Sequence, residues 1–267
     1  MPRRTIALLT DFGIQSPYVG ILKGVIYGIN PEANIIDLCH DITPYGVTEA
    51  AFLLETSYRY LPMRTIFLVV VDPGVGSARK AIASTGDRGV YVAPDNGVLT
   101  QVMASDSLNV FYELSAEHYR LEPVSSTFHG RDIFAPAAAY LSNGIDMTSF
   151  GEVVEKPVQL QLPRPKAEGS SLVGQVLYID RFGNLVTNIN RPTLQNVLEK
   201  YGLRGFLASV GSTNLEQHIE HYGQIQPGAL ASIFGSFNHL EIVVREGSAA
   251  QTLGASIGTP VAVRFFK

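Results

Sequence analysis

The first 160 residues alternate between short apolar runs and longer segments with helical periodicity. Buried strands are expected at residues 5–9, 34–37, 65–71, 81–84 and 90–92. Helices are expected between some of these runs, at residues 18–29 and 47–60. Strands that alternate with helices are typical of an α/β domain whose mostly parallel sheet carries helices on its faces.

The chain changes character after residue 162. Residues 163–171 are rich in proline, glycine and charge, as is usual for a linker. Beyond them, strand-like segments at 172–179, 231–234, 240–244 and 261–266 are separated by glycine-rich turns. The sequence therefore predicts an N-terminal α/β domain over residues 1–162 and a smaller, barrel-like β domain over residues 172–267.

Charge and composition limit the classes of partner that the chain can bind. Twenty basic and 24 acidic side chains give a net charge of −4, which offers no basic surface for nucleic acid or an anionic membrane. The longest apolar run has far fewer than the ~20 residues that a bilayer requires. The single cysteine, Cys39, excludes an internal disulfide. These features favour a reduced, cytoplasmic protein.

Two short patterns imitate known binding motifs but fail in context. Asp11-Phe12-Gly13 copies the metal-binding tripeptide of protein kinases, yet the ten residues before it leave no room for the glycine-rich and catalytic loops expected upstream in a kinase. The glycines that begin at Gly74 lack the third glycine of a dinucleotide fingerprint. His218 and His221 would share a face if their segment were helical, but two solvated histidines are the simpler interpretation.

Polar residues at the ends of predicted strands are the best candidates for chemistry. Asp11 and Asp72 each follow a buried run, and in open α/β sheets the functional site lies at the carboxyl ends of the strands. Each residue also has a structural explanation: Asp72 as a turn former, Asp132 as a helix cap, His129 as a loop histidine. Six polar clusters favour a site over six separate structural roles; they lie around Asp11, Asp72, Asp95, His129, Asp180 and Glu241.

Taken together, these clusters resemble the S-adenosyl-L-methionine hydroxide adenosyltransferases, relatives of the fluorinating and chlorinating enzymes. The resemblance runs from Asp11-Phe12-Gly13 to Leu240-Glu241-Ile242. It implies an N-terminal α/β domain, a C-terminal β-barrel and a homotrimer that holds substrate between neighbouring subunits. It also implies hydrolysis of S-adenosyl-L-methionine to adenosine and L-methionine, with no metal or other cofactor.

The same resemblance assigns roles to individual residues. The family's catalytic Asp, Arg and His fall on Asp72, Arg79 and His129. Ser16 stands where relatives carry an aspartate, and Arg245-Glu246 replaces small residues that are usual there. The resemblance places seven residues at the substrate: Asp11, Ser16, Tyr45, Asp180, Asn184, Ser236 and Glu241.

These residue types suit attack by water on a sulfonium. The leaving group departs as a neutral thioether, so the reaction needs an oriented water rather than a general acid. Either Asp72 or His129 takes the proton, and Arg79 holds Asp72 ionised. Halogenating relatives carry tyrosine at Asp72 and hydroxyl side chains at Val75 and Gly130, so this chain favours water over halide.

Two other functions fit the same residues. One is a metal-dependent hydrolase that uses Asp11, Asp72, His129 and Asp132 as ligands. The other is a protein that binds S-adenosylmethionine without turnover. Activity that survives a chelator would exclude the metal-dependent hydrolase. Formation of adenosine would exclude a protein that only binds S-adenosylmethionine.

Overall fold

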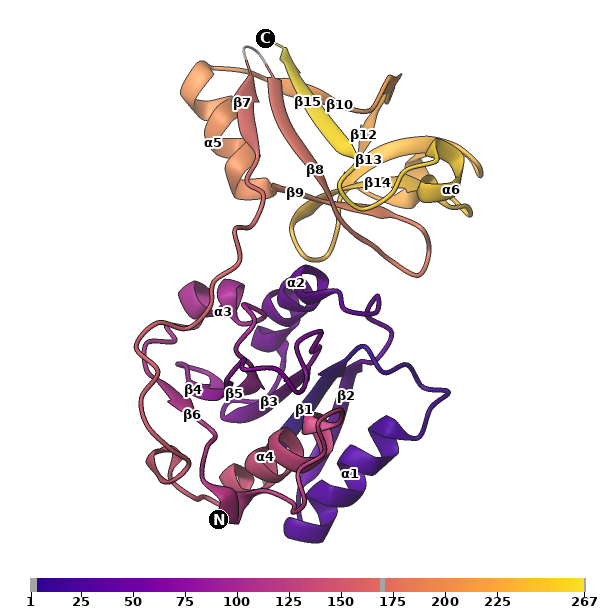
Figure 1. Ribbon diagram of the computed structural model, residues 1–267. Helices are drawn as coiled ribbons and strands as arrows, with labels where there is room; N and C mark the ends of the chain where they lie inside the picture. The colour runs from indigo at the N-terminus through magenta and orange to yellow at the C-terminus, as the bar shows by residue number, and fades with distance from the viewer. Residues whose placement is uncertain (1–3, 169–170, 267) are drawn as a thin grey trace. The chain divides into compact units, whose positions relative to one another are not determined.

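Two neighbouring interior strands of the N-terminal sheet are β1 (Thr5–Thr10) and β3 (Thr65–Val70), and every residue in both is buried. The computed structural model describes residues 4–168 and 171–266. Its chain divides into two compact units, Met1–Gln161 and Leu162–Lys267 (Figure 1). We describe each unit by itself.

Within residues 4–161, the sheet of the first unit has six strands in the order β2-β1-β3-β5-β4-β6. The pairs between β2, β1, β3 and β5 are parallel, whereas β4 pairs antiparallel with both β5 and β6. The predicted α/β class with a mostly parallel sheet is therefore confirmed. The remaining strands are β2 (Asn34–Cys39), β4 (Ala81–Thr85), β5 (Gly89–Pro94) and β6 (Phe111–Glu113).

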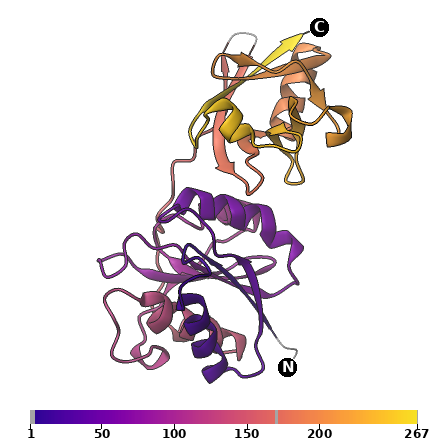
Figure 2. The same ribbon diagram turned by 90° about the vertical axis from the view of Figure 1, so that its right-hand side faces the viewer.

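Helices cover both faces of this sheet (Figures 1 and 2). Alternate residues of β1 point to opposite faces. Ile6 and Leu8 pack with α1 and α4, while Ala7 and Leu9 pack with α2 and α3. The helices are α1 (Tyr18–Ile29), α2 (Val47–Ser57), α3 (Thr100–Ser105) and α4 (Ala135–Ser142). Single helical turns lie at Tyr58–Tyr60, Glu117–Tyr119, Gly130–Phe134 and Met147–Ser149.

The second unit is a curled, barrel-like sheet. Its strand order is β11-β10-β15-β8-β9-β14-β13-β12, with β7 paired to β8. Inside the curl lies a cluster of buried aliphatic side chains from β8, β9, β10, β14 and β15. The strands are β7 (Lys166–Glu168), β8 (Ser171–Ile179), β9 (Leu185–Asn190), β10 (Gly205–Val210), β11 (Thr213–Asn214), β12 (His218–Ile219), β13 (Leu230–Phe234), β14 (His239–Val244) and β15 (Pro260–Phe266).

Two helices and a 3-10 turn complete the second unit: α5 (Arg191–Tyr201), α6 (Ala249–Leu253) and Tyr222–Gln224. Asn190 caps α5 by accepting a hydrogen bond from the Thr193 amide, and Gly202 ends it in the left-handed conformation. Neither α5 nor α6 was expected from the sequence.

Two details differ from the sequence-based expectations. Residues 166–168, inside the predicted linker, form β7 because they pair with the first three residues of β8. Residues 169–170 of that linker lie outside the described residues. The segment at His218 is a strand rather than a helix, since it pairs with β13. Within the described residues, none of the helices is long and apolar enough to span a membrane.

Candidate active site

Asp72 and Arg79 meet where the chain leaves the carboxyl end of β3. The Asn96 side-chain amide donates to the Val71 carbonyl (2.8 Å), which fixes the chain just before Asp72. The Arg79 Nε donates to Asp72 Oδ1 (2.9 Å) and Oδ2 (3.1 Å), and its Nη2 also donates to Oδ2. Both side chains are largely buried. A forked guanidinium–carboxylate pair of this kind fixes direction as well as charge.

A tight loop returns the chain from Asp72 to Arg79. The Ser77 amide donates to the Gly74 carbonyl (3.1 Å), closing one turn of that loop. Gly76 has a φ of +76°, and a Cβ there would lie 2.2 Å from the Ser126 carbonyl oxygen. Only glycine permits this approach. The loop is thereby packed against the segment that leads to His129.

His129 lies beside the same Arg79 nitrogen, Nη2, that donates to Asp72. Arg79 Nη2 lies 2.7 Å from His129 Nδ1. A guanidinium has donors only, so Nδ1 is the acceptor and the neutral ring carries its proton on Nε2. His129 thus offers an N–H donor at Nε2, and one arginine holds both Asp72 and His129.

Burial and charge keep the His129 ring neutral. Burial is the larger cause that lowers its pKa below the usual 6.5, and the adjacent Arg79 guanidinium lowers the pKa further. Asp72 acts in the opposite direction, with a smaller effect. At neutral pH the imidazole is therefore an uncharged hydrogen-bond donor.

Asp72 and His129 face one cavity of about 280 Å³. Asp11 lines it too, and its Oδ2 accepts a hydrogen bond from the Tyr45 amide (2.9 Å). Tyr45 has a left-handed φ of +67° and its side chain is exposed. Asp11, Tyr45, Asp72 and His129 are thus brought together as lining residues, and Val75 and Gly130 share the wall.

An aromatic wall on the same cavity was not expected from the sequence. Phe12, Tyr18 and Phe128 contact one another, with ring centroids 5.2–5.9 Å apart, and all three line the cavity. Phe12 adjoins Asp11 and Phe128 adjoins His129, so adjacency to a candidate residue was the available signal for two of the three. Aromatic faces carry partial negative charge and favour a nearby cation.

A second polar group forms in the other unit around Asp180. Its Oδ1 accepts from the Phe182 and Asn184 amides (both 2.9 Å), and its Oδ2 accepts from Asn184 Nδ2 (2.8 Å). Tyr222 OH lies 3.4 Å from the same Asn184 nitrogen. Within the described residues, the Asn184 side-chain oxygen has no hydrogen bond, so it is left to accept one from a ligand.

Glu241 belongs to this second group and is 7% exposed. Its carboxylate lies against Gly235, where a Cβ would be 1.7 Å from Oε1. Burial, and then the nearby Asp180, raise its pKa to about 7. In the described part of the chain, this carboxylate has no hydrogen bond or ion pair. A buried, unpartnered acid is suited to receive a donor or cation from a ligand.

The raised pKa predicts that Glu241→Gln stabilises the protein at alkaline pH. The folded pKa of Glu241 exceeds the unfolded value of 4.5. The contribution of Glu241 to the free energy of unfolding is therefore fully present below pH 4.5 and is lost as pH rises through about 7. Glutamine stays neutral, so the variant should lie within about 1 kcal/mol of wild type at pH 5. By pH 8.5 it should exceed wild type by at most about 3 kcal/mol.

Denaturant unfolding at pH 5 and pH 8.5 measures this difference. The control is Glu199→Gln, which makes the same change at an exposed position of α5. Its stability should follow wild type at both pH values. Parallel pH profiles for wild type and Glu241→Gln would show that the Glu241 pKa is not raised.

Other candidates stand apart from both groups. Ser16 is exposed and is not among the cavity-lining residues, and Ser236 is exposed in the second unit. Asp132 accepts from the Ser125 amide (2.8 Å) and pairs with Arg131, so it is structural. His218 packs against Phe206. Among the described residues, no three His, Cys, Asp or Glu side chains are grouped to hold a metal ion.

The fold and the two polar groups define a two-unit enzyme: an α/β sheet with a carboxylate–guanidinium–imidazole centre, and a curled β unit with an acid–amide group. The family model for the SAM hydroxide adenosyltransferase N-terminal domain matches residues 6–151 of this chain. The model for the C-terminal domain of the same family matches residues 174–262. The chain belongs to the SAM hydroxide adenosyltransferase family, which confirms the resemblance.

Named relatives and a solved structure are also similar to this chain over nearly its whole length. A protein of Thermus thermophilus named (R)-S-adenosyl-L-methionine hydrolase is 37% identical over 97% of this chain and 98% of its own. One of the same name from Salinispora tropica is 33% identical over 96% of each chain. A fluorinase of Nocardia brasiliensis is 27% identical over 98% of this chain and 97% of its own. A crystal structure of an uncharacterised conserved protein from Thermotoga maritima superposes with a TM-score of 0.88 at 35% identity, covering 97% and 99% of the two chains.

Proposed function

We propose that this protein hydrolyses S-adenosyl-L-methionine to adenosine and L-methionine by attack of water on C5′ of the ribose. The observation that carries the proposal is the double contact of Arg79, which donates to Asp72 and to His129 Nδ1 beside one cavity. Relatives that align over nearly the whole chain are named (R)-S-adenosyl-L-methionine hydrolase, so the epimer with R configuration at sulfur is the proposed substrate.

The reaction breaks the C5′–S bond and forms a C5′–O bond. The bonding electrons leave with sulfur, which turns the sulfonium into the neutral thioether of methionine. Water supplies the new oxygen and loses one proton. Since the departing group needs no protonation, the protein's task is to hold water in line with the C–S bond, and orientation of this kind is worth roughly 7–11 kcal/mol.

The tautomer of His129 divides the roles within the centre. Nδ1 is occupied by the Arg79 donor and Nε2 already carries a proton, so the imidazole orients water as a hydrogen-bond donor. Asp72 accepts the proton as the C–O bond forms. Arg79 positions both groups and keeps the carboxylate turned toward the cavity.

The lining also supports water rather than halide as the nucleophile. A halide site must hold a desolvated anion with neutral donors, and a carboxylate such as Asp72 repels that anion. Val75 and Gly130 line the cavity without a hydroxyl group. The aromatic wall of Phe12, Tyr18 and Phe128 would favour the sulfonium through its ring faces.

The remaining polar residues fit the rest of the substrate. Asp11 has one oxygen bound to the Tyr45 amide and one left for the ribose hydroxyls. The free Asn184 oxygen suits the adenine amino group, and the Asp180 and Glu241 acids suit amino groups of the substrate. We also propose, on family resemblance, a cytoplasmic homotrimer in which Ser16, Ser236 and these acids complete the site across subunits. A solution mass of three chains checks the trimer, and cell fractionation checks the location.

Incubation with S-adenosylmethionine in ¹⁸O-water tests the reaction. We expect ¹⁸O in the 5′-hydroxyl of adenosine, found by mass spectrometry, and the same rate in the presence of EDTA. The separated R and S epimers at sulfur should differ, with R consumed faster. Tight binding without adenosine would indicate a binding protein, loss of activity with EDTA would indicate a metal-dependent hydrolase, and unlabelled adenosine would exclude attack by solvent.

A further inference from the structure

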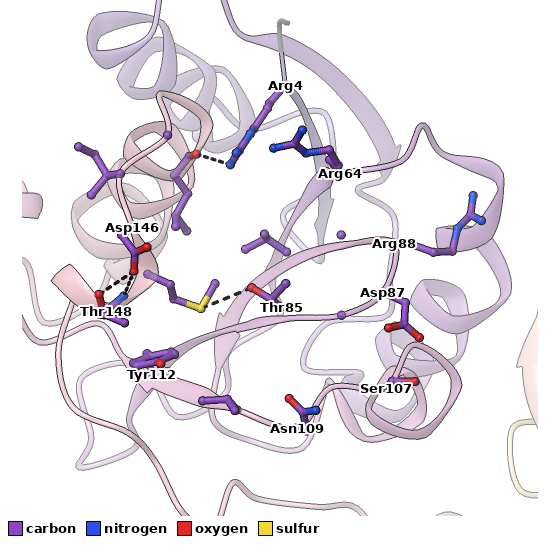
Figure 3. A pocket seen from close by; sticks show the side chains of 18 residues that line it. Arg4, Arg64, Thr85, Asp87, Arg88, Ser107, Asn109, Tyr112, Asp146 and Thr148 are labelled. Atoms are coloured by element: carbon purple, nitrogen blue, oxygen red, sulfur yellow. Dashed lines mark hydrogen bonds between the residues drawn. The ribbon is translucent and has the colours of Figure 1, made fainter. Parts of the chain in front are cut away.

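We propose that a second pocket, at the amino ends of the parallel strands, binds a small phosphorylated anion. This proposal is independent of the proposed hydrolysis, whose residues lie at the carboxyl ends of the same strands. Arg4, Arg64 and Arg88 each directly precede one strand: β1, β3 and β5. These strands are neighbours in the sheet and run parallel. The topology therefore gathers three arginines along one edge of the sheet, and all three line the pocket (Figure 3).

None of the three arginines is neutralised by a carboxylate in the described part of the chain. Arg4 Nη1 donates to the Leu141 carbonyl (3.0 Å), and Arg88 Nη2 donates to the Arg59 carbonyl (2.8 Å). The Arg64 guanidinium has neither a hydrogen bond nor an ion pair with the described residues. Five of the other seven basic side chains described in this unit do have acidic partners. Three of the five without one, Arg4, Arg64 and Arg88, lie at this edge.

The backbone holds Arg64 in an unusual conformation. Its φ is +67°, a left-handed value that glycine adopts more readily than arginine. The Arg64 amide is bound to the Arg88 carbonyl (2.5 Å), which ties this strained turn to the start of the neighbouring strand. Strain that persists at a charged, unpaired side chain points to a role for that side chain. In Figure 3, both Arg4 and Arg64 project from this edge toward the pocket, whereas the Arg88 guanidinium turns away toward the Arg59 carbonyl.

The rest of the pocket matches a phosphate ester rather than a bare cation or a lipid tail. The pocket holds about 670 Å³, within the range of small-molecule sites. Thr85 and Tyr112 supply hydroxyl groups, and Val90 and Met147 supply apolar surface. Guanidinium forks match the oxygens of a phosphoryl group, and the apolar surface would accept the organic portion of an ester.

Two carboxylates also line the pocket. Asp146 is occupied locally, because its Oδ1 accepts from the Thr148 amide (2.9 Å) and hydroxyl (2.6 Å). Asp87 is exposed and lies on the side of the pocket next to Ser107 (Figure 3). The three arginines outnumber these two acids, which leaves the pocket with a net positive charge.

Titration calorimetry of the full chain with inorganic phosphate and phenyl phosphate, in a phosphate-free buffer, tests the proposal. The variant is Arg64→Gly, which removes the unpaired guanidinium and relaxes the left-handed turn, so its melting temperature should be unchanged or raised. The control is Lys200→Ala, which removes one positive charge from an exposed position of the other unit.

We expect saturable binding to wild type and to Lys200→Ala with equal affinity, and at least tenfold weaker binding to Arg64→Gly. Tighter binding of phenyl phosphate would identify an organic ester as the ligand, and equal binding would identify free phosphate. Two results would overturn the proposal: no saturable binding of either probe to wild type, or equal affinity in Arg64→Gly and Lys200→Ala.

Discussion

Asp72→Asn should lose adenosine formation by roughly 10²–10⁴-fold, the usual contribution of a general base. Asparagine has nearly the same shape and keeps an acceptor for Arg79 Nε, but its amide cannot take a proton from water. Chromatographic measurement of adenosine under single-turnover conditions gives the rate of the chemical step. Adenosine binding by the variant should be largely retained, since the loss is one of chemistry.

Stability must be measured beside this rate, because Arg79 loses its ionic partner in the variant. Removing one partner of a buried pair can destabilise a fold by about 3–5 kcal/mol. Thermal melts will show whether the variant remains folded at the assay temperature. Asp37→Asn is the matched control, since Asp37 pairs with Lys23 and His40 outside the cavity and its own side chain is exposed. If folded Asp72→Asn turned over within threefold of wild type, Asp72 would not be the proton acceptor.

Substitutions of His129 should separate a donor from a base. If the imidazole orients water through Nε2–H, His129→Ala should lose about 10²–10³-fold in rate, as when one donor is removed from other active sites. His129→Gln keeps an N–H donor and should stay within tenfold of wild type. A base at this position would make glutamine as inactive as alanine. Rates of adenosine formation for the two variants decide between the roles.

The pH profile gives a second measurement of the same residue. Burial and Arg79 lower the pKa of His129 below 6.5, so the ring is neutral at pH 7 and above. Protonation in acid would place a proton on Nδ1, facing the Arg79 donor, and would break that contact. Wild-type activity should therefore be constant from neutral to alkaline pH and fall in acid. His129→Gln should move that acid fall to lower pH; an unchanged profile would argue against titration of His129.

Strong burial made the first unit predictable. The apolar runs at β1 and β3 correspond to strands that are buried on both faces, and α1 begins and ends where its apolar periodicity does. The second unit was harder, because α5 buries only Leu194 and so shows a weak apolar stripe. Its start and end were nonetheless marked by Asn190 and Gly202, two residues with strong preferences for helix termini.

The sequence supplied candidates for the site but not their arrangement. The family pattern assigns Asp72, Arg79 and His129 to one catalytic group, and in the structure Arg79 contacts both of the others. The same pattern also named Ser16 and Ser236, for which the described contacts give no partner. The aromatic wall was missed because phenylalanines such as Phe12 and Phe128 are usually core residues. Only the cavity that they share in the structure distinguishes them.

By itself, the sequence determined the α/β class, the buried strands and the residue types available for chemistry, because burial of a strand on both faces requires an uninterrupted apolar run. Only the tertiary structure decided which nitrogen of His129 carries the proton, since that depends on Arg79, 50 residues away along the chain. It also decided that Arg4, Arg64 and Arg88 share one edge. Strand order, rather than separation along the chain, sets which residues become neighbours.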